Sequence, residues 1–390
     1  MSAALRATSA ATPIALSIQL CMALCLTASA PAQQPAGPAA SAATPAPAPP
    51  VLSTPGPLFI TPESALHQPV TVIAYGDMRF TDRSNVSATS PAARDALVAR
   101  IAEEKPDAVL LSGDIPWHGG VAADYAEYRT ETAIWRANNL RVYPALGNHE
   151  LSQCPVAQCL QNWWAAFPEL ANRRWYSAQL GDKFYLFALD SDSSLLPGSD
   201  QRVWFEAQVA ALPKTVRFVL ITMHHPPVAD IQTRYEVDHN PRPNEISLRD
   251  YLSSIAPKSR ARFIVAAGHI HNYERFSLDG VTYFVSGGGG AQPYLVDRTP
   301  PDLYQDTAFP NYHYINSSSK AMSSKAPCSA SPTRPPQPQS GRSKTPSQSA
   351  PNKPPHFFLS RSSRSSIFSV SMFSLPESPW ISLSARRFTS

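Results

Sequence analysis

Cysteine is scarce in this sequence, which limits what a thiol site could be. Of five cysteines in 390 residues, Cys21 and Cys25 fall in an apolar N-terminal segment, and Cys328 has no nearby partner. Cys154 and Cys159 are close enough to form a disulfide that closes a small loop, or to supply two thiolates to a metal. Because no second cysteine pair lies nearby, we favour the disulfide.

Long apolar runs are also missing, except at the N-terminus. Residues 1–32 carry one charge, Arg6, followed by an apolar stretch and by small residues that end at Ala30-Pro31-Ala32. This is the pattern of a secretory signal peptide cut near Ala32, and it predicts a periplasmic or secreted protein. A membrane-spanning helix is the alternative, but the stretch is short and broken by Thr, Ser and Gln. We therefore expect no stable membrane anchor.

Acidic residues are nearly absent from residues 317–390, which contain ten Lys or Arg, 23 serines and the single acid Glu377. This tail has a formal charge of +9 and residues 1–316 have −5, so the basic pI of about 8.8 comes from the tail and predicts no nucleic-acid partner. Such a composition cannot bury enough surface to fold, so we expect a disordered extension or a translation out of frame. Residues 33–68, rich in Pro and Ala, are expected to form a linker, which leaves 69–316 as the folded domain.

A P-loop is absent as well. The glycines at 287–290 resemble a phosphate cradle, but no helical pattern with a lysine follows them. We expect instead a turn that passes close beside a site.

The folded domain contains apolar strands that alternate with amphipathic helices. This alternation predicts an α/β layered fold in which helices cover the sheets. Strands are expected within 70–77, 107–114, 140–150, 216–227, 261–271 and 280–290, with a hairpin-like pair at 174–191, and helices are expected within 91–104, 121–138, 201–212 and 248–255.

Five of the expected strands end in a side chain that can bind a metal. In open α/β sheets, sites form where the carboxyl ends of strands open into loops, so we expect these side chains to meet. A carboxylate that bridges two divalent ions, flanked by imidazoles and an amide oxygen, suits Mn, Fe or Zn. The residues are Asp77, Asp114, Asn148, His224 and the pair His269 and His271.

At these strand ends the sequence resembles a known family. The segments GDMR (76–79), GDIPW (113–117), GNHE (147–150), MHHPP (223–227) and GHIH (268–271) are similar to the five ordered motifs of calcineurin-like metallophosphoesterases. The NYER that follows GHIH, together with the later glycine run, most resembles the purple acid phosphatase branch. The resemblance covers about Val70 to Gly290 and implies a four-layer α/β/β/α sandwich.

The resemblance also implies a role for each matching residue. Asp77 and His271 would hold a first ion, Asp114 would bridge both ions, and the second ion would be held by Asn148, His224 and His269. His149 would donate a proton to the leaving group or steady the phosphate, whereas His225 matches a position that is not a ligand. His239, in the loop after the fourth motif, is a candidate substrate-facing residue.

Two residues depart from the family pattern. Trp117 stands where purple acid phosphatases have a metal-binding tyrosine, and an indole cannot ligate a metal. Arg79 stands where relatives outside that branch have a histidine, so the first ion would have fewer protein ligands. We expect a colourless protein. Arg79 would either grip a substrate phosphate with its planar fork or pair with a nearby carboxylate.

The motifs predict an exported dinuclear metal-dependent phosphoesterase that hydrolyses small phosphomonoesters by attack of metal-bound hydroxide. A phosphodiesterase on the same site, and a catalytically degenerate protein that binds phosphate compounds, are the alternatives. The sequence fixes neither the metals nor the oligomeric state.

Overall fold

Two β-sheets form the centre of the fold in a computed structural model of the chain. The structure describes residues 56–170, 172–230, 239–306 and 311–319. All of these residues belong to one unit, Val51–Ser390.

The smaller sheet has four strands in the order β11-β2-β3-β4. Strands β2 (Thr71–Tyr75), β3 (Ala108–Leu111) and β4 (Val142–Pro144) are parallel, and β11 (Ile315–Ser318) pairs antiparallel with β2. Every residue of β3 is buried, as expected for a parallel strand covered on both faces.

The larger sheet has seven strands in the order β1-β5-β6-β7-β8-β10-β9. Its centre is parallel, while β5 with β6 and β9 with β10 form antiparallel pairs. The strands are β1 (Phe59–Thr61), β5 (Tyr176–Leu180), β6 (Phe184–Ala188), β7 (Phe218–Thr222), β8 (Arg262–Ala267), β9 (Tyr273–Leu278) and β10 (Val281–Ser286).

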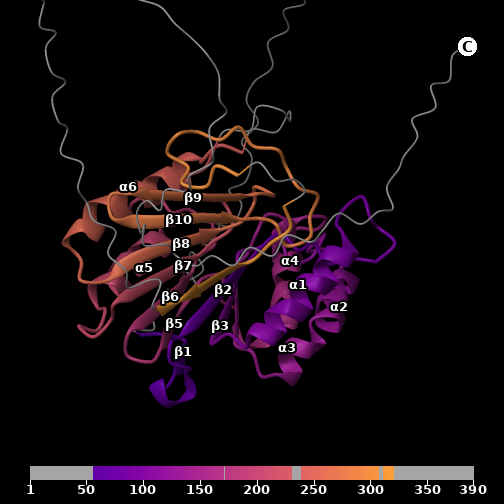
Figure 1. The fold of residues 1–390 in the computed structure, drawn as a ribbon, viewed down its shortest axis with the longest axis horizontal. Helices are drawn as coiled ribbons and strands as arrows, with labels where there is room; N and C mark the ends of the chain where they lie inside the picture. Colours follow the sequence, from indigo (N-terminus) through magenta and orange to yellow (C-terminus); the bar gives the residue numbers. More distant parts are fainter. Residues whose placement is uncertain (1–55, 171, 231–238, 307–310, 320–390) are drawn as a thin grey trace, which may run out of the picture. The chain divides into compact units, whose positions relative to one another are not determined.

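Helices cover the outer faces of both sheets. Figure 1 shows α1 to α4 beside β2 and β3, and α5 and α6 on the opposite side, beside the larger sheet. The helices are α1 (Pro91–Glu104), α2 (Ala122–Glu131), α3 (Ala133–Ala137), α4 (Val156–Ala166), α5 (Asp200–Ala210) and α6 (Pro243–Ile255). Short 3-10 turns occupy Glu63–Ala65, His149–Leu151, Pro168–Leu170 and Ala256–Lys258.

The alternation of side chains along β6 explains why the layers stack. Phe184 and Leu186 pack into the core that β6 shares with β2 and β3, whereas Tyr185 and Phe187 pack into the core under α5 and α6. The larger sheet therefore has apolar side chains on both faces. The prediction of a four-layer α/β/β/α sandwich is confirmed.

The expected linker at 33–68 is wrong for at least residues 59–68. Strand β1 pairs in parallel with β5, and the Phe59 ring packs 6.2 Å from Tyr143 and 5.7 Å from Tyr176, measured between ring centroids. Phe59 is partly buried and packs edge-on against both tyrosines at the margin of the core. This strand was not predicted because it has only three residues and is flanked by prolines.

Three further elements differ from expectation. Strand β11 reaches Ser318, which is two residues beyond the expected boundary at 316. Strand β9, which begins within NYER, and helix α4 were not predicted at all.

Some predictions fall outside the described residues. These are the signal peptide at 1–32, the tail from residue 320 on and Cys328. Among the residues that are described, every helix is too short or too polar to cross a bilayer.

The predicted disulfide between Cys154 and Cys159 is confirmed. It links two Cα atoms 5.7 Å apart, where the chain leaves the third motif and enters α4. The bridge therefore fixes the first turn of a helix that begins six residues after Glu150.

Three buried carboxylates meet where the segment after β7, strand β9 and the segment before β11 come together. The Asp230 N–H donates to Glu274 Oε2 at 2.6 Å, and Thr299 donates through its N–H and its hydroxyl to Asp230 Oδ1. Asp302 lies in the same cluster and pairs with Arg298 at 2.7 Å. Burial, and to a lesser extent the nearby Asp302, raises the pKa of Asp230 to about 6.

Asp230→Asn is expected to stabilise the protein at pH 8 and to leave it no more stable at pH 4. Because the pKa of Asp230 is raised on folding, the folded protein holds a proton that the unfolded chain releases, so stability falls as pH rises from about 4 to about 6. Asparagine removes this loss, worth roughly 1 kcal/mol in the free energy of unfolding. Melting temperature against pH is the measurement, and the exposed Asp279→Asn is the control. An equal gain at both pH values would contradict the assignment.

Candidate metal centre

The predicted site residues come together between the two sheets. Strands β2, β3 and β4 belong to one sheet and β7 and β8 to the other, so the strand ends do not lie on a single sheet edge as expected. Instead the carboxyl ends of both sheets face one another. Contacts that join them include Thr222 Oγ1 to Leu111 O at 3.5 Å and His224 Nδ1 to Ser112 O at 2.9 Å.

A first group contains Asp77, Asp114 and His271. All three are buried, and each offers a ligand atom within 4.8 Å of the others. His271 Nε2 lies 3.4 Å from Asp77 Oδ1. The two aspartates have left-handed backbones, with φ of 60° and 55°, a conformation that is uncommon outside glycine and that concentrates at functional sites.

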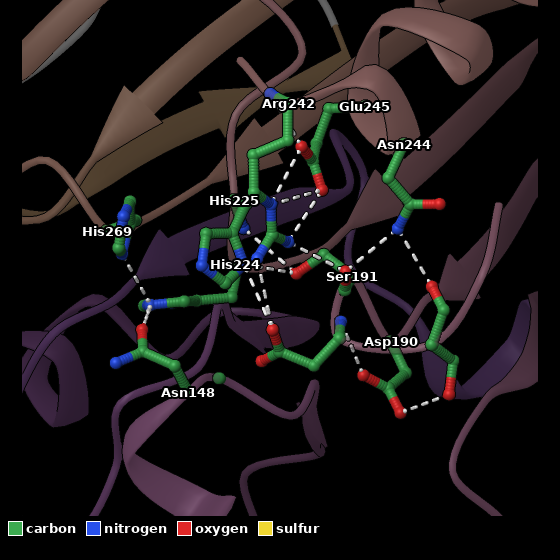
Figure 2. A network of polar contacts seen from close by, with 12 residues as sticks. Asn148, Asp190, Ser191, His224, His225, Arg242, Asn244, Glu245 and His269 are labelled. Atoms are coloured by element: carbon green, nitrogen blue, oxygen red, sulfur yellow. Dashed lines mark hydrogen bonds and ion pairs between the residues drawn. The ribbon is translucent and has the colours of Figure 1, made fainter. Parts of the chain in front are cut away.

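A second group surrounds the Nε2 atom of His224. Asn148 Oδ1 lies 2.9 Å from this nitrogen, and Asp114 Oδ1 and His269 Nδ1 each lie 3.2 Å from it. Figure 2 shows Asn148 and His269 approaching His224 from two sides. The structure adds His225 to this group, with a ring nitrogen within 4.8 Å of those of His224 and His269.

Hydrogen bonds fix which nitrogen of three histidines faces the site. The Nδ1 atoms of His224, His271 and His149 lie 2.9, 2.7 and 2.6 Å from the carbonyl oxygens of Ser112, Gln292 and Trp117. A carbonyl can only accept, so each Nδ1 carries a proton and Nε2 is the nitrogen that faces the site. Metal-binding histidines are commonly held in this way.

The residues fit a pair of divalent ions. The Nε2 atom of His271 is buried and has no hydrogen-bond partner, so it is an orphan that an ion would satisfy. Next to His224 Nε2 lie an amide oxygen, a carboxylate oxygen and a second imidazole nitrogen, which is a ligand set that suits a divalent ion.

The charges around the two groups support the same conclusion. Burial acts to raise the pKa of Asp114, but His224, His149 and Arg79 outweigh it and hold this pKa well below its ordinary value. Burial, with the neighbouring His224 and His225, holds the pKa of His269 well below its ordinary value. The site therefore presents an ionised carboxylate beside a neutral imidazole, the protonation states that metal ligands need.

Sequence reasoning missed the part played by Glu150. Its buried carboxylate accepts from the backbone N–H groups of Asp114, Ile115 and Gly147 at 3.0, 2.8 and 2.7 Å. Glu150 therefore ties the turn after β3 to the turn after β4. The residue stands in GNHE, but its type and spacing give no sign of these backbone contacts.

His149 lies at the edge of the first group. Its N–H donates to Asp114 Oδ1 at 3.0 Å, and its Nε2 lies 3.7 Å from Asp114 Oδ2. Burial lowers the pKa of His149 from its ordinary value. The imidazole is 14% exposed, which leaves it open to a bound substrate.

Arg79 pairs with a carboxylate, and that carboxylate is Asp114. Arg79 Nη2 lies 3.3 Å from Asp114 Oδ2, and its Cζ lies 5.1 Å above the Trp117 ring centroid. Trp117 therefore supports the guanidinium in the structure, in place of the ligand that a tyrosine would supply.

Residues of later segments close the site. The His239 ring lies 4.7 Å from that of His269, next to the second group, and its role toward a substrate stays a prediction. Tyr294, which sequence reasoning missed, stacks on His271 at 4.1 Å between ring centroids. The expected close approach of the glycine run is confirmed, because a Cβ at Gly289 would meet Gly76 O at 2.2 Å.

Known proteins resemble this chain in sequence and in fold. A probable purple acid phosphatase of Arabidopsis thaliana is 28% identical over 190 residues, which span 42% of each chain. The purple acid phosphatase of yellow lupin (Lupinus luteus) seeds has a similar fold, with a TM-score of 0.53 and 17% identity over 65% of this chain and 50% of that one. A dimetal phosphatase of Danio rerio matches with a TM-score of 0.44 and 15% identity over 64% of this chain and 93% of its own. The chain thus spans half or less of the length of the two purple acid phosphatases.

The family comparison covers the same segments that form the two groups. The model of the calcineurin-like phosphoesterases matches residues 71–277, more than half of the chain, from the start of β2 into β9. The chain belongs to the calcineurin-like phosphoesterase family, and it resembles the purple acid phosphatase branch of that family.

Proposed function

We propose that this protein is an exported, metal-dependent hydrolase of small phosphomonoesters. The observation that carries the proposal is the buried group of Asp77, Asp114 and His271, with its orphaned Nε2, beside the second group around His224. Preference for monoesters follows from the similarity to purple acid phosphatases.

Two ions would need seven ligand positions from the protein. Six side chains supply them, because Asp114 would bind both ions. Two divalent ions (Mn, Fe or Zn), when bound, would polarise the phosphoryl group and lower the pKa of a water that attacks it. The first ion would be held by Asp77, Asp114 and His271, and the second by Asp114, Asn148, His224 and His269.

His149 would manage the proton of the leaving group. Its Nδ1–H is held by Trp117 O, so Nε2 is the atom that would carry a proton to the leaving oxygen or donate to the phosphate. His239, whose ring lies beside that of His269, would contact the substrate there.

The pair between Arg79 and Asp114 favours a second candidate function. A cation that already neutralises the bridging carboxylate would weaken ion binding, and the protein would then bind phosphate compounds without turnover.

If Arg79 grips the substrate phosphate in addition to Asp114, Arg79→Ala is expected to raise KM about tenfold, because one charge-assisted hydrogen bond to the substrate is lost. Steady-state kinetics with Arg79→Lys, which keeps the charge but not the planar fork, test the geometry. If KM and kcat both stay unchanged in the alanine variant, Arg79 pairs only with Asp114 and has no phosphate role.

The pure metal-loaded protein is expected to be colourless. Trp117 occupies the position from which a tyrosine would give purple acid phosphatases their colour, and an indole cannot ligate. A visible absorption spectrum is the measurement, and a purple band would overturn this reasoning about Trp117.

Metal analysis combined with an activity screen tests the function itself. We expect two ions per chain and faster hydrolysis of p-nitrophenyl phosphate than of bis(p-nitrophenyl) phosphate, with activity lost on chelation and restored by Mn, Fe or Zn. Faster hydrolysis of the bis ester would make the protein a phosphodiesterase. One ion or none, with phosphate binding but no turnover, would make it a binding protein.

Export is a separate part of the proposal. It depends on residues 1–32, which lie outside the described residues. N-terminal sequencing of the protein from the periplasm or medium is expected to begin after Ala32, and a chain retained in the cytoplasm with Met1 would contradict export.

A further inference from the structure

His225 lies inside the second group, although the family pattern gives it no ligand role. Its ring centroid is 4.2 Å from that of His269 and 4.9 Å from that of His224, and the residue is 6% exposed. Figure 2 shows the His225 ring between His269 and Ser191.

The Ser191 hydroxyl determines which nitrogen of His225 carries the proton. Ser191 Oγ accepts from the His225 N–H at 3.1 Å and lies 2.8 Å from His225 Nδ1. The hydroxyl is buried, so its own hydrogen needs an acceptor, and Nδ1 is the one within reach. Asp192 Oδ1 is 3.9 Å from the same nitrogen, beyond hydrogen-bond distance. Nδ1 therefore accepts, and Nε2 carries the hydrogen.

This assignment makes His225 the chemical opposite of its neighbours. His224 and His271 hold their Nδ1–H on carbonyl oxygens and face the site with Nε2, the nitrogen left to bind a metal. His225 presents an N–H, which a metal cannot use. Within the described part of the chain, this N–H has no hydrogen-bond acceptor.

Ser191 is itself held in place by the start of α6. Arg242 Nη2 and Asn244 Nδ2 donate to Ser191 O at 2.8 and 3.0 Å, and Arg242 pairs with Glu245 at 2.7 Å (Figure 2). A donor supported in this way keeps its direction when a ligand arrives, so little reorganisation is needed on binding.

We propose that the Nε2–H of His225 donates a hydrogen bond to a phosphoryl oxygen of the substrate and of the phosphate product, with Ser191 as its positioning residue. Phosphoryl oxygens only accept, and one held next to His224 and His269 lies within reach of His225. The inference rests on the proposed function, because it needs phosphate to bind at this site.

Inorganic phosphate is the probe, and calorimetric titration of the metal-loaded protein is the measurement. His225→Ala is expected to weaken phosphate binding about tenfold, the loss of one hydrogen bond to a charged group, with the ion content unchanged. His225→Gln, whose amide can still donate, is expected to recover part of the loss. His67→Ala is the control, because that histidine is 68% exposed and lies at the opposite end of the small sheet.

The measured ion content and phosphate affinity distinguish failure of the His225 proposal from failure of the proposed function. Loss of an ion from His225→Ala would make His225 a ligand and overturn the proposal, and so would unchanged phosphate affinity with both ions retained. If the wild-type protein binds neither ions nor phosphate, the proposed function itself fails.

Ser191→Ala provides a second test of the proposal if His225→Ala does not fold. The His225 ring stays in place, but without the Ser191 hydroxyl its proton can sit on either nitrogen. Phosphate affinity is therefore expected to fall about threefold. Ser254→Ala, at an exposed serine near the end of α6, is the matched control. Wild-type phosphate affinity in Ser191→Ala would reject the positioning role.

Discussion

Asp114→Asn is expected to lower kcat/KM by about 10³-fold or more, since each tenfold factor corresponds to about 1.4 kcal/mol and an ion contributes several kcal/mol to transition-state stabilisation. The reason is that Asp114 belongs to both groups. Its carboxylate lies 3.2 Å from His224 Nε2 and within 4.8 Å of the ligand atoms of Asp77 and His271.

Asparagine matches the size of Asp114 but not its chemistry. The carboxylate accepts from the His149 N–H and faces Arg79 Nη2, so an amide NH2 would meet a donor on either side. We expect the variant to bind fewer ions per chain. Ion content by elemental analysis and kcat/KM on p-nitrophenyl phosphate are the measurements.

Asp107→Asn is the matched control, because Asp107 is equally buried and lies at the other end of the same strand, β3. It accepts from the N–H groups of His67 and Thr71, each at 2.8 Å. Its replacement is expected to lower the melting temperature and to leave ion content and kcat/KM of the folded protein unchanged. Near-normal activity in Asp114→Asn would refute the two-ion arrangement.

His149→Ala is expected to lower kcat by about 10²–10³-fold without loss of ions, which is the usual contribution of a general acid. The imidazole has no ligand position in either group but lies 3.7 Å from Asp114 Oδ2. Its effect should therefore fall on the chemical step and not on metal binding.

The choice of leaving group separates the two roles considered for His149. If it protonates the leaving group, the loss in kcat should be larger for an alkyl phosphate than for p-nitrophenyl phosphate, whose leaving group needs little help. If it only steadies the phosphate, both substrates should lose equally.

His118→Ala is the control for His149, because the two rings lie 6.1 Å apart in parallel planes, and His118 bonds to Ser152 Oγ at 3.2 Å. We expect less than about a threefold change in kcat for this control. An unchanged kcat in His149→Ala would remove that residue from the reaction.

Much of the site could be predicted from sequence because each candidate ligand lies within four residues of the end of a strand. Burial of β2, β3, β7 and β8 gives continuous apolar runs, and a polar residue at the end of such a run is conspicuous. Asp77, Asp114 and His271 were expected together, and the structure brings them together.

Other features left little or no trace in the sequence. Glu150 acts through backbone N–H groups, which every residue possesses, so no residue type marks its partners. Tyr294 reaches His271 through the return of the chain after β10, a path set by tertiary packing. Strand β1 is too short to show a period.

The sequence by itself determined the class of fold, the family and the positions of the candidate ligands, because strand periodicity and motif order are local properties of the chain. Only the tertiary structure decided that the strand ends come from two facing sheets, that Arg79 lies on Asp114, and that His225 carries its proton on Nε2 where His224 carries one on Nδ1. The physical reason is that a histidine's tautomer and an arginine's partner depend on which acceptor lies within about 3 Å, and that acceptor is supplied by residues distant in the chain.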